Sequence, residues 1–221
     1  MQNSRSRGAG RYIACMGMFI ALAYVSVVAT EWIPKVSGIL SYEPKDAIIV
    51  IAGFIFGPLS CVILSVAVSL LELVTVSSTG PWGFLMNAIA SCAFTVPAAL
   101  FYRLNRSRKG ALMGLGAAML SMTGMMILWN YIVTPLYMGV PREEVAKMLV
   151  PTFLPFNLIK GGLNAGLVML LYKPVVSALR KTGLVEQKQG KKGSISLGFT
   201  LFALAFLATF VLLLLAMLKV I

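Results

Sequence analysis

Long apolar blocks separated by short polar segments dominate this sequence. A helix needs about 20 mostly apolar residues to cross a bilayer, because every backbone N–H and C=O inside hydrocarbon must be paired within the segment. Blocks of this kind lie at 12–31, 46–57, 59–76, 83–102, 111–135, 153–178 and 197–218. The sequence therefore predicts an all-α, polytopic helical bundle that has the lipid bilayer as its solvent.

The composition supports the same class. The chain has 221 residues, of which 59% are hydrophobic and 12% charged, and one soluble core of this size would not bury so much apolar surface. The block at 46–57 is unusually short, since it follows Pro44 and ends at Gly57-Pro58. It is expected either to cross only part of the membrane or to bend directly into the following block.

The N-terminus begins with arginines followed by an apolar run, which is also typical of a secretory signal. The run is longer than such a signal and lacks a small-x-small cleavage site, so it is interpreted as a retained first helix.

The basic residues predict the orientation. Of the nineteen Lys and Arg, three precede the first block, four lie in 103–109 and six in 173–192, whereas the alternate loops carry four basic and five acidic residues. By the positive-inside rule, the protein is a multi-pass cell-membrane protein with a cytoplasmic N-terminus. Nucleic acid is not an expected partner, because the basic residues are divided among short loops without a folded basic domain.

Several kinds of chemistry are excluded or disfavoured. The chain has no histidine, which removes His-based catalysis and His-ligated metals. The three cysteines lie far apart inside apolar blocks and are interpreted as packing residues. No phosphate-binding or dinucleotide-binding glycine motif occurs. We therefore expect no catalytic residues, no metal and no cofactor, and any energy from ATP must come from another subunit.

Polar residues within the apolar blocks indicate a binding site. Asn157, Lys160 and Asn164 are spaced to share one helix face, as are Asn130 and Thr134. Lys160 and Glu72 are ionisable groups inside predicted spans, where insertion costs about 2.5–3.5 kcal/mol each, so they are expected to face a cavity or a partner. A Lys160–Glu72 ion pair that only joins two helices is the structural alternative.

Four segments, taken in order, carry a family resemblance. They are Tyr-Glu-Pro-Lys-Asp at 42–46 followed by Gly-Phe-Ile-Phe-Gly-Pro at 53–58, Ser-Ser-Thr-Gly at 77–80 with Asn87, Asn-Tyr-Ile-Val-Thr-Pro-Leu-Tyr at 130–137, and Pro-Phe-Asn-Leu-Ile-Lys-Gly at 155–161. Together they resemble the substrate-binding S component of an energy-coupling-factor (ECF) vitamin transporter, most closely the riboflavin-specific type. The resemblance covers about residues 10–180.

The resemblance implies a six-helix core that captures riboflavin, or a related flavin, as transported substrate at its outer face. It also implies a transmembrane coupling subunit and two cytoplasmic ATPases as partners. In this family the first helix docks on the coupling subunit through a small-x-x-x-small pattern, which Gly17 and Ala21 match. Ordinary packing within the chain is an equally good explanation of that spacing alone.

The resemblance also implies ligand residues. Asn157 and Lys160 match the ligand motif of the sixth helix and Asn130 that of the fifth, while Asp46 and the loop with Thr79 and Gly80 are expected to contact a ribityl chain and to form the outer gate. The full predicted substrate-binding set is Tyr42, Asp46, Thr79, Gly80, Asn130, Thr134, Asn157, Lys160 and Asn164.

One segment departs from the family pattern. The predicted parts are an N-terminal tail (1–11), the six-helix domain (12–180), a basic linker (181–196) and a further C-terminal transmembrane helix (197–221), and the resemblance does not explain the last. Three alternatives to riboflavin capture remain: an S component for another vitamin or flavin analogue, a self-sufficient secondary carrier, and an intramembrane enzyme whose only acid–base groups would be Glu72 and Lys160.

Overall fold

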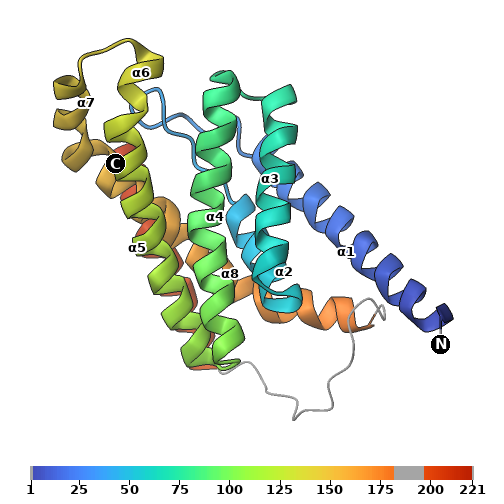
Figure 1. Cartoon of the computed structure of the whole chain (residues 1–221). Coiled ribbons are helices and arrows are strands. Elements are labelled where there is room, and N and C mark those ends of the chain that lie inside the picture. Colours follow the sequence, from blue (N-terminus) through green and yellow to red (C-terminus); the bar gives the residue numbers. More distant parts are fainter. Residues whose placement is uncertain (1, 182–196, 221) are drawn as a thin grey trace.

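The computed structural model describes residues 2–181 and 197–220, and within these ranges it contains only helices, turns and one isolated β-bridge. The long helices are α1 (Gln2–Val28), α2 (Lys45–Phe56), α3 (Pro58–Thr75), α4 (Gly80–Leu104), α5 (Arg108–Ile132), α8 (Leu154–Lys181) and α9 (Leu197–Met217). Short helical segments between α5 and α8 are α6 (Thr134–Met138), α7 (Arg142–Met148) and the π-helical turn η1 (Leu149–Phe153). The predicted all-α bundle, including its C-terminal apolar helix, is confirmed (Figure 1).

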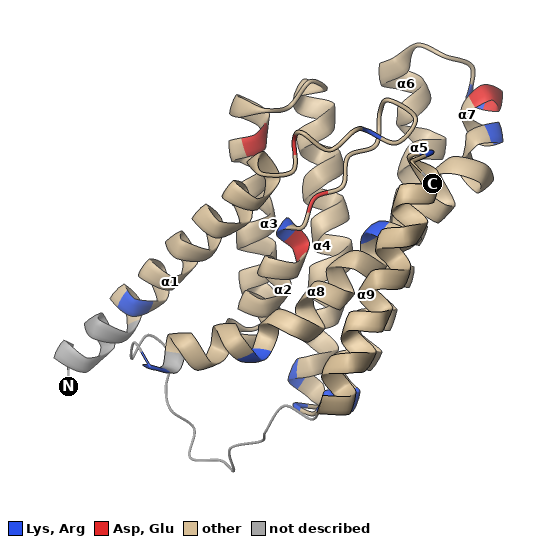
Figure 2. Ribbon diagram, turned by 180° about the vertical axis from the view of Figure 1, so that it is seen from behind, with Lys and Arg blue, Asp and Glu red and all other residues tan. Residues whose placement is uncertain are grey.

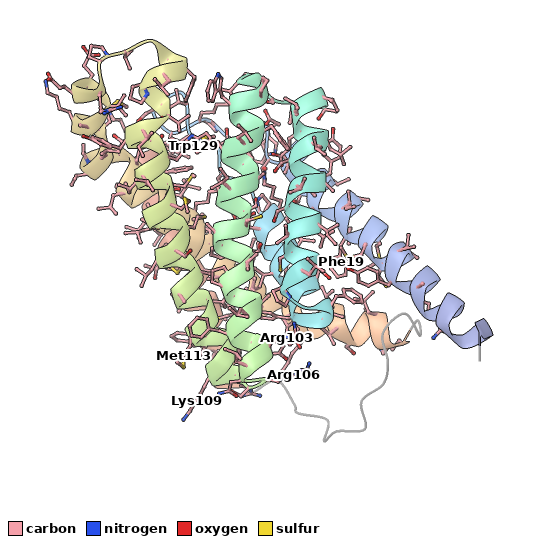
Figure 3. The ribbon with its side chains drawn as sticks, viewed as in Figure 1. Phe19, Arg103, Arg106, Lys109, Met113 and Trp129 are labelled. Carbon is pink, nitrogen blue, oxygen red and sulfur yellow. The ribbon has the colours of Figure 1, made fainter. Side chains whose placement is uncertain are left out.

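The helices run between two ends of the bundle (Figure 1). We call the end where α3 meets α4 the upper end, and the end where α4 meets α5 the lower end. Arg103 near the end of α4, Arg106 in the α4–α5 connection and Lys109 near the start of α5 lie at the lower end (Figure 3). Among the described residues, the charged ones at the lower end are all basic, and the acidic ones lie at the middle of the bundle or above it (Figure 2). The two ends therefore differ in charge as the sequence predicted.

Helix α2 crosses only part of the bundle. Its 12 residues span about 18 Å, little more than half of a hydrocarbon core. It starts near the middle of the bundle and descends to the lower end, where the chain reverses into α3 (Figure 1). The reversal depends on Gly57, whose φ of 100° suits glycine, and on Pro58 at the start of α3. The block at 46–57 thus crosses only part of the bundle and also bends directly into the following helix, so both sequence alternatives hold.

Two predicted parts flank the six-helix domain. Helix α1 starts at Gln2, so residues 2–11 of the predicted N-terminal tail are helical and continue into the first span. The predicted linker 181–196 lies, apart from Lys181, outside the described residues.

Small residues bring the core helices close together. A Cβ atom at Gly53 in α2 would lie 2.2 Å from the Cys61 sulfur in α3, and one at Gly114 in α5 would lie 2.8 Å from the Ala98 carbonyl oxygen in α4. Such close approach is how membrane helices gain packing energy where no hydrophobic effect drives them together. The buried Phe19 of α1, labelled in Figure 3, lies edge-on to Phe56 of α2, with ring centroids 6.3 Å apart. Cys61 has the packing role that the sequence predicted.

Candidate ligand-binding site

A cavity of about 210 Å³ opens at the upper end of the bundle. The connection between α1 and α2, residues 29–44, which we call loop L1, covers one side of it, and the α3–α4 connection covers another. Helices α4, α5 and α8 supply most of the deeper wall. The lining residues that the argument below uses are Glu43, Glu72, Thr79, Asn87, Asn130, Asn157 and Lys160, together with an apolar group described separately.

Loop L1 enters the bundle after a tight turn. Val36 and Leu40 form an isolated antiparallel bridge, with N–H to O distances of 2.9 and 3.1 Å, and Ser37 and Gly38 between them have positive φ. The chain then descends from the upper end toward the start of α2 (Figure 1). As a result, Glu43 and Lys45 lie inside the bundle, although the sequence places them among the four basic and five acidic residues of the alternate loops.

Four side chains form a continuous charged network beside the cavity. The Lys45 ammonium donates to a Glu72 carboxylate oxygen at 2.7 Å and lies 3.0 Å from the Glu43 carboxylate. The Lys160 ammonium lies 3.0 Å from the same oxygen of Glu43. Lys45 is 1% exposed and Lys160 is 8% exposed. Both cations are therefore almost out of contact with solvent, and each has a carboxylate partner, as buried charges require.

The Lys160–Glu72 pair considered from the sequence is wrong. Glu72 pairs with Lys45 and accepts a hydrogen bond from the Asn87 amide at 2.7 Å, whereas Lys160 pairs with Glu43. Helix α2 begins at Lys45 and places its ammonium between the Glu43 and Glu72 carboxylates, so Glu72 already has a cationic partner. Burial raises the pKa of the Glu43 carboxyl in loop L1, but the nearby Lys160 and Lys45 charges outweigh this and hold it below its usual range.

Two asparagines present amide edges to the cavity. The Asn130 side chain donates to the Met126 carbonyl at 2.7 Å, and Asn157 donates to the Phe153 carbonyl at 2.8 Å. Each amide keeps a second N–H, and the Asn157 oxygen has no hydrogen-bond partner among the described residues. An amide that is fixed in this way offers both a donor and an acceptor to a ligand.

Four members of the predicted set, Thr79, Asn130, Asn157 and Lys160, line the cavity. Thr134 does not, but its hydroxyl donates to the Asn130 side-chain oxygen at 2.9 Å. Thr134 therefore orients a lining residue from behind.

The remaining four predicted residues also lie off the cavity wall. Asp46 is 1% exposed and accepts from the Ser91 hydroxyl at 2.6 Å, and Asn164 is fully buried and donates to the Glu43 carbonyl at 3.2 Å. Tyr42 packs into an apolar cluster beneath loop L1, and Gly80 begins α4 with a φ of 56°. Asn164 also accepts from the Ala47 N–H at 3.2 Å, so it ties α8 to both loop L1 and α2.

The apolar wall was not predicted. It consists of four methionines and three aromatic residues, namely Met86, Met122, Met126, Met138, Tyr137, Phe153 and Phe156. Tyr42, the aromatic residue of the predicted substrate-binding set, is absent from the lining. A sequence signal for part of this wall exists: Met122 and Met126 precede Asn130 at intervals of four, and Phe153 and Phe156 precede Lys160 at intervals of seven and four, so each group shares a helix face.

The Gly17 and Ala21 face of α1 is open. Both residues are exposed, and a Cβ atom built at Gly17 would meet nothing within 4 Å. Packing within the chain therefore does not explain the small-x-x-x-small spacing.

A helical membrane bundle whose buried polar side chains converge on one cavity defines a ligand-binding membrane protein. The chain belongs to the family described as "ECF transporter, substrate-specific component", which matches residues 11–172. Members of this family are transport components, and the chain is accordingly not an enzyme.

Two curated relatives are riboflavin transporters. The chain is 30% identical over 172 residues to the riboflavin transporter RibU of Staphylococcus aureus. This alignment covers 75% of this chain and 90% of the relative. It is 26% identical over 158 residues to the riboflavin transporter FmnP of Bacillus subtilis, covering 67% of this chain and 83% of the relative.

A solved structure has the same fold. It is titled "Structure and mechanism of the S component of a bacterial ECF transporter" and matches with a TM-score of 0.64 and 28% identity. The match covers 99% of that chain and 81% of this one, and the family match ends at residue 172. Helix α9 thus lies beyond the residues that match the family.

Proposed function

We propose that this chain is the substrate-capture subunit of an ATP-driven vitamin importer and that riboflavin binds in the upper cavity. The observation that carries the proposal is the convergence of Asn130, Asn157 and Lys160 on one cavity with a methionine and aromatic wall. The two riboflavin transporters among the relatives support the choice of substrate.

The chemistry of the wall suits a planar heterocycle with polar edges. Thioether and aromatic side chains pack against a flat ring, and methionine adapts its shape to the ring surface. The Asn130 and Asn157 amides would meet the alternating donors and acceptors of the uracil-like edge of a flavin. A mostly apolar pocket with a few fixed polar groups is the usual form of a small-molecule site.

Lys160 would give a third polar contact. Its ammonium has three protons, and the ion pair with Glu43 occupies only part of that capacity. Another proton would be donated to a carbonyl or hydroxyl oxygen of the ligand, while Glu43 continues to compensate the charge. Thr134 and Asn164 would act as positioning residues, since they hold Asn130 and loop L1 in place.

The family and the charge of the two ends support the proposed assembly. The basic lower end would face the cytoplasm, so the cavity at the upper end would open outward. The open α1 face with Gly17 and Ala21 would dock on a transmembrane coupling subunit. Two ATPases would supply the energy of ATP hydrolysis, since this chain has no phosphate-binding motif of its own.

Two measurements on the same purified chain test the proposal. Titration with riboflavin, followed through flavin fluorescence, should show saturable binding without ATP hydrolysis. In proteoliposomes the chain alone should not accumulate riboflavin, and addition of the coupling subunit and the ATPases should start ATP-dependent uptake. Uptake by the chain alone would identify a secondary carrier, and tight binding of a different vitamin would change the substrate.

A further inference from the structure

Helix α9 packs tightly along α8 although it lies outside the family match. Gly162 and Gly166 are one turn apart on α8, and they face α9. A Cβ atom at Gly162 would lie 2.3 Å from the Phe210 ring, and one at Gly166 would lie 3.0 Å from Leu207. The glycines therefore form a groove that the α9 side chains fill, which is the geometry of a specific helix pair.

The upper half of α9 also reaches loop L1. One apolar cluster contains Val36, Leu40 and Tyr42 of the loop, with residues of both helices. The helix residues of the cluster are Phe156, Ile159 and Leu163 of α8, and Leu207, Phe210, Leu214 and Met217 of α9, together with Leu218. We call this group the brace cluster. Leu214 is its most buried α9 side chain, at 9% exposed, and Val36 is 3% exposed.

Loop L1 consequently lies between two environments. Gly38–Ser41 and Glu43 line the cavity on one side, and the brace cluster holds the loop on the other. The backbone hydrogen bonds around its turn stay within the loop: they join Val36 and Leu40 in both directions and run from Gly38 to Lys35 and from Ile39 to Val36. Its position therefore depends on side-chain packing, and part of that packing comes from α9.

We propose that α9 braces loop L1 over the cavity, with Leu214 as a positioning residue that acts on the ligand site through the loop. The effect on ligand binding rests on the proposed function, whereas the effect on the loop does not. Loss of the brace would let the loop open more often, and a bound ligand would then leave faster. The open α1 face is unaffected, because α1 packs on α2 and α3 and α9 packs on α8.

The first test needs no ligand. Leu214→Ala is compared with Leu213→Ala, whose side chain is 46% exposed, by amide hydrogen exchange in lipid nanodiscs. Leu214→Ala should speed exchange at the Val36 and Leu40 amides while α3, α4 and α5 keep wild-type protection, and Leu214→Met should restore protection. Unchanged loop exchange, or a rise spread evenly over the helices, would overturn the brace. If Leu214→Ala does not fold, Met217→Ala provides the same comparison.

The second test measures riboflavin dissociation from the same variants. Leu214→Ala should release riboflavin roughly three- to tenfold faster with little change in the association rate, as interface changes usually act on dissociation, and Leu213→Ala should match wild type. Faster loop exchange with unchanged dissociation would disprove the link between brace and ligand site. Failure of the wild-type chain to bind riboflavin would instead refute the proposed function and leave the exchange result standing.

Discussion

Glu43 and Lys160 are 117 residues apart in the sequence, yet the carboxylate of one lies 3.0 Å from the ammonium of the other. This contact joins loop L1 to the helix that carries most of the predicted ligand residues. The same Glu43 oxygen also lies 3.0 Å from Lys45. The Glu43 carboxylate therefore connects loop L1 with the short helix α2 and with α8 at the side of the cavity.

Replacement of Lys160 by Met should weaken riboflavin binding by roughly 10- to 100-fold, which corresponds to the loss of a hydrogen bond from a charged donor. The fold should survive, because Glu43 keeps its 3.0 Å contact with Lys45 and, at 13% exposed, borders the cavity and is less buried than Glu72. Isothermal titration calorimetry measures the change. Lys147→Met, at an exposed position of α7, is the matched control and should bind normally. Wild-type affinity for Lys160→Met would make the Glu43 pair a purely structural contact.

Thr134→Val should lower riboflavin affinity about fivefold, since the bond that orients Asn130 is worth about 1 kcal/mol. Thr134 does not line the cavity, so any effect must act through the Asn130 amide. The same titration checks this, with Thr75→Val as the control because Thr75 is exposed and bonds only within its own helix. Equal affinities for the two variants would argue against a positioning role for Thr134.

Lys45→Met should destabilise the protein strongly, by about 3–5 kcal/mol, because it leaves Glu72 as an uncompensated buried charge. The measurement is the midpoint of thermal unfolding in detergent. A second replacement, Glu72→Met, should recover much of the loss, since it removes the charge left behind. If Lys45→Met alone unfolds at the wild-type temperature, the Lys45–Glu72 pair does not stabilise the bundle.

Gly17→Leu combined with Ala21→Leu should leave riboflavin binding intact and abolish ATP-driven uptake, because bulky side chains on the open α1 face would prevent close approach of a partner helix. Uptake into proteoliposomes with the coupling subunit and ATPases measures this. Gly116→Leu with Gly124→Leu is a matched control on α5, where a Cβ atom also meets nothing within 4 Å. Normal uptake by the α1 variant would remove the docking role of this face.

Features that depend on local pattern were predictable. The apolar blocks correspond to helices because backbone pairing in lipid leaves few alternatives, and the 3.6-residue repeat correctly placed Asn157 and Lys160 on one face toward a cavity. The same periodicity in α5 places Met122 and Met126 on the face of Asn130, which is a sequence signal for part of the apolar wall.

Features that depend on depth and tertiary contact were not predictable. Nothing in the sequence of loop L1 shows that it descends into the bundle, since an irregular segment has no periodicity, and so Glu43 and Lys45 were counted among the outer charges. The pairing of Lys160 follows from where α2 begins, which only the packed bundle defines. Gly162 and Gly166 were a visible signal for a close helix neighbour, but spacing alone does not identify that neighbour as α9.

The visible absorption spectrum of the purified chain tests the central claim most directly. Protein prepared from cells supplied with riboflavin should be yellow and carry flavin in a stoichiometric amount, and the Lys160→Met variant prepared in parallel should carry much less. A folded, colourless wild-type protein that does not bind added riboflavin would contradict the proposal that this cavity captures a flavin.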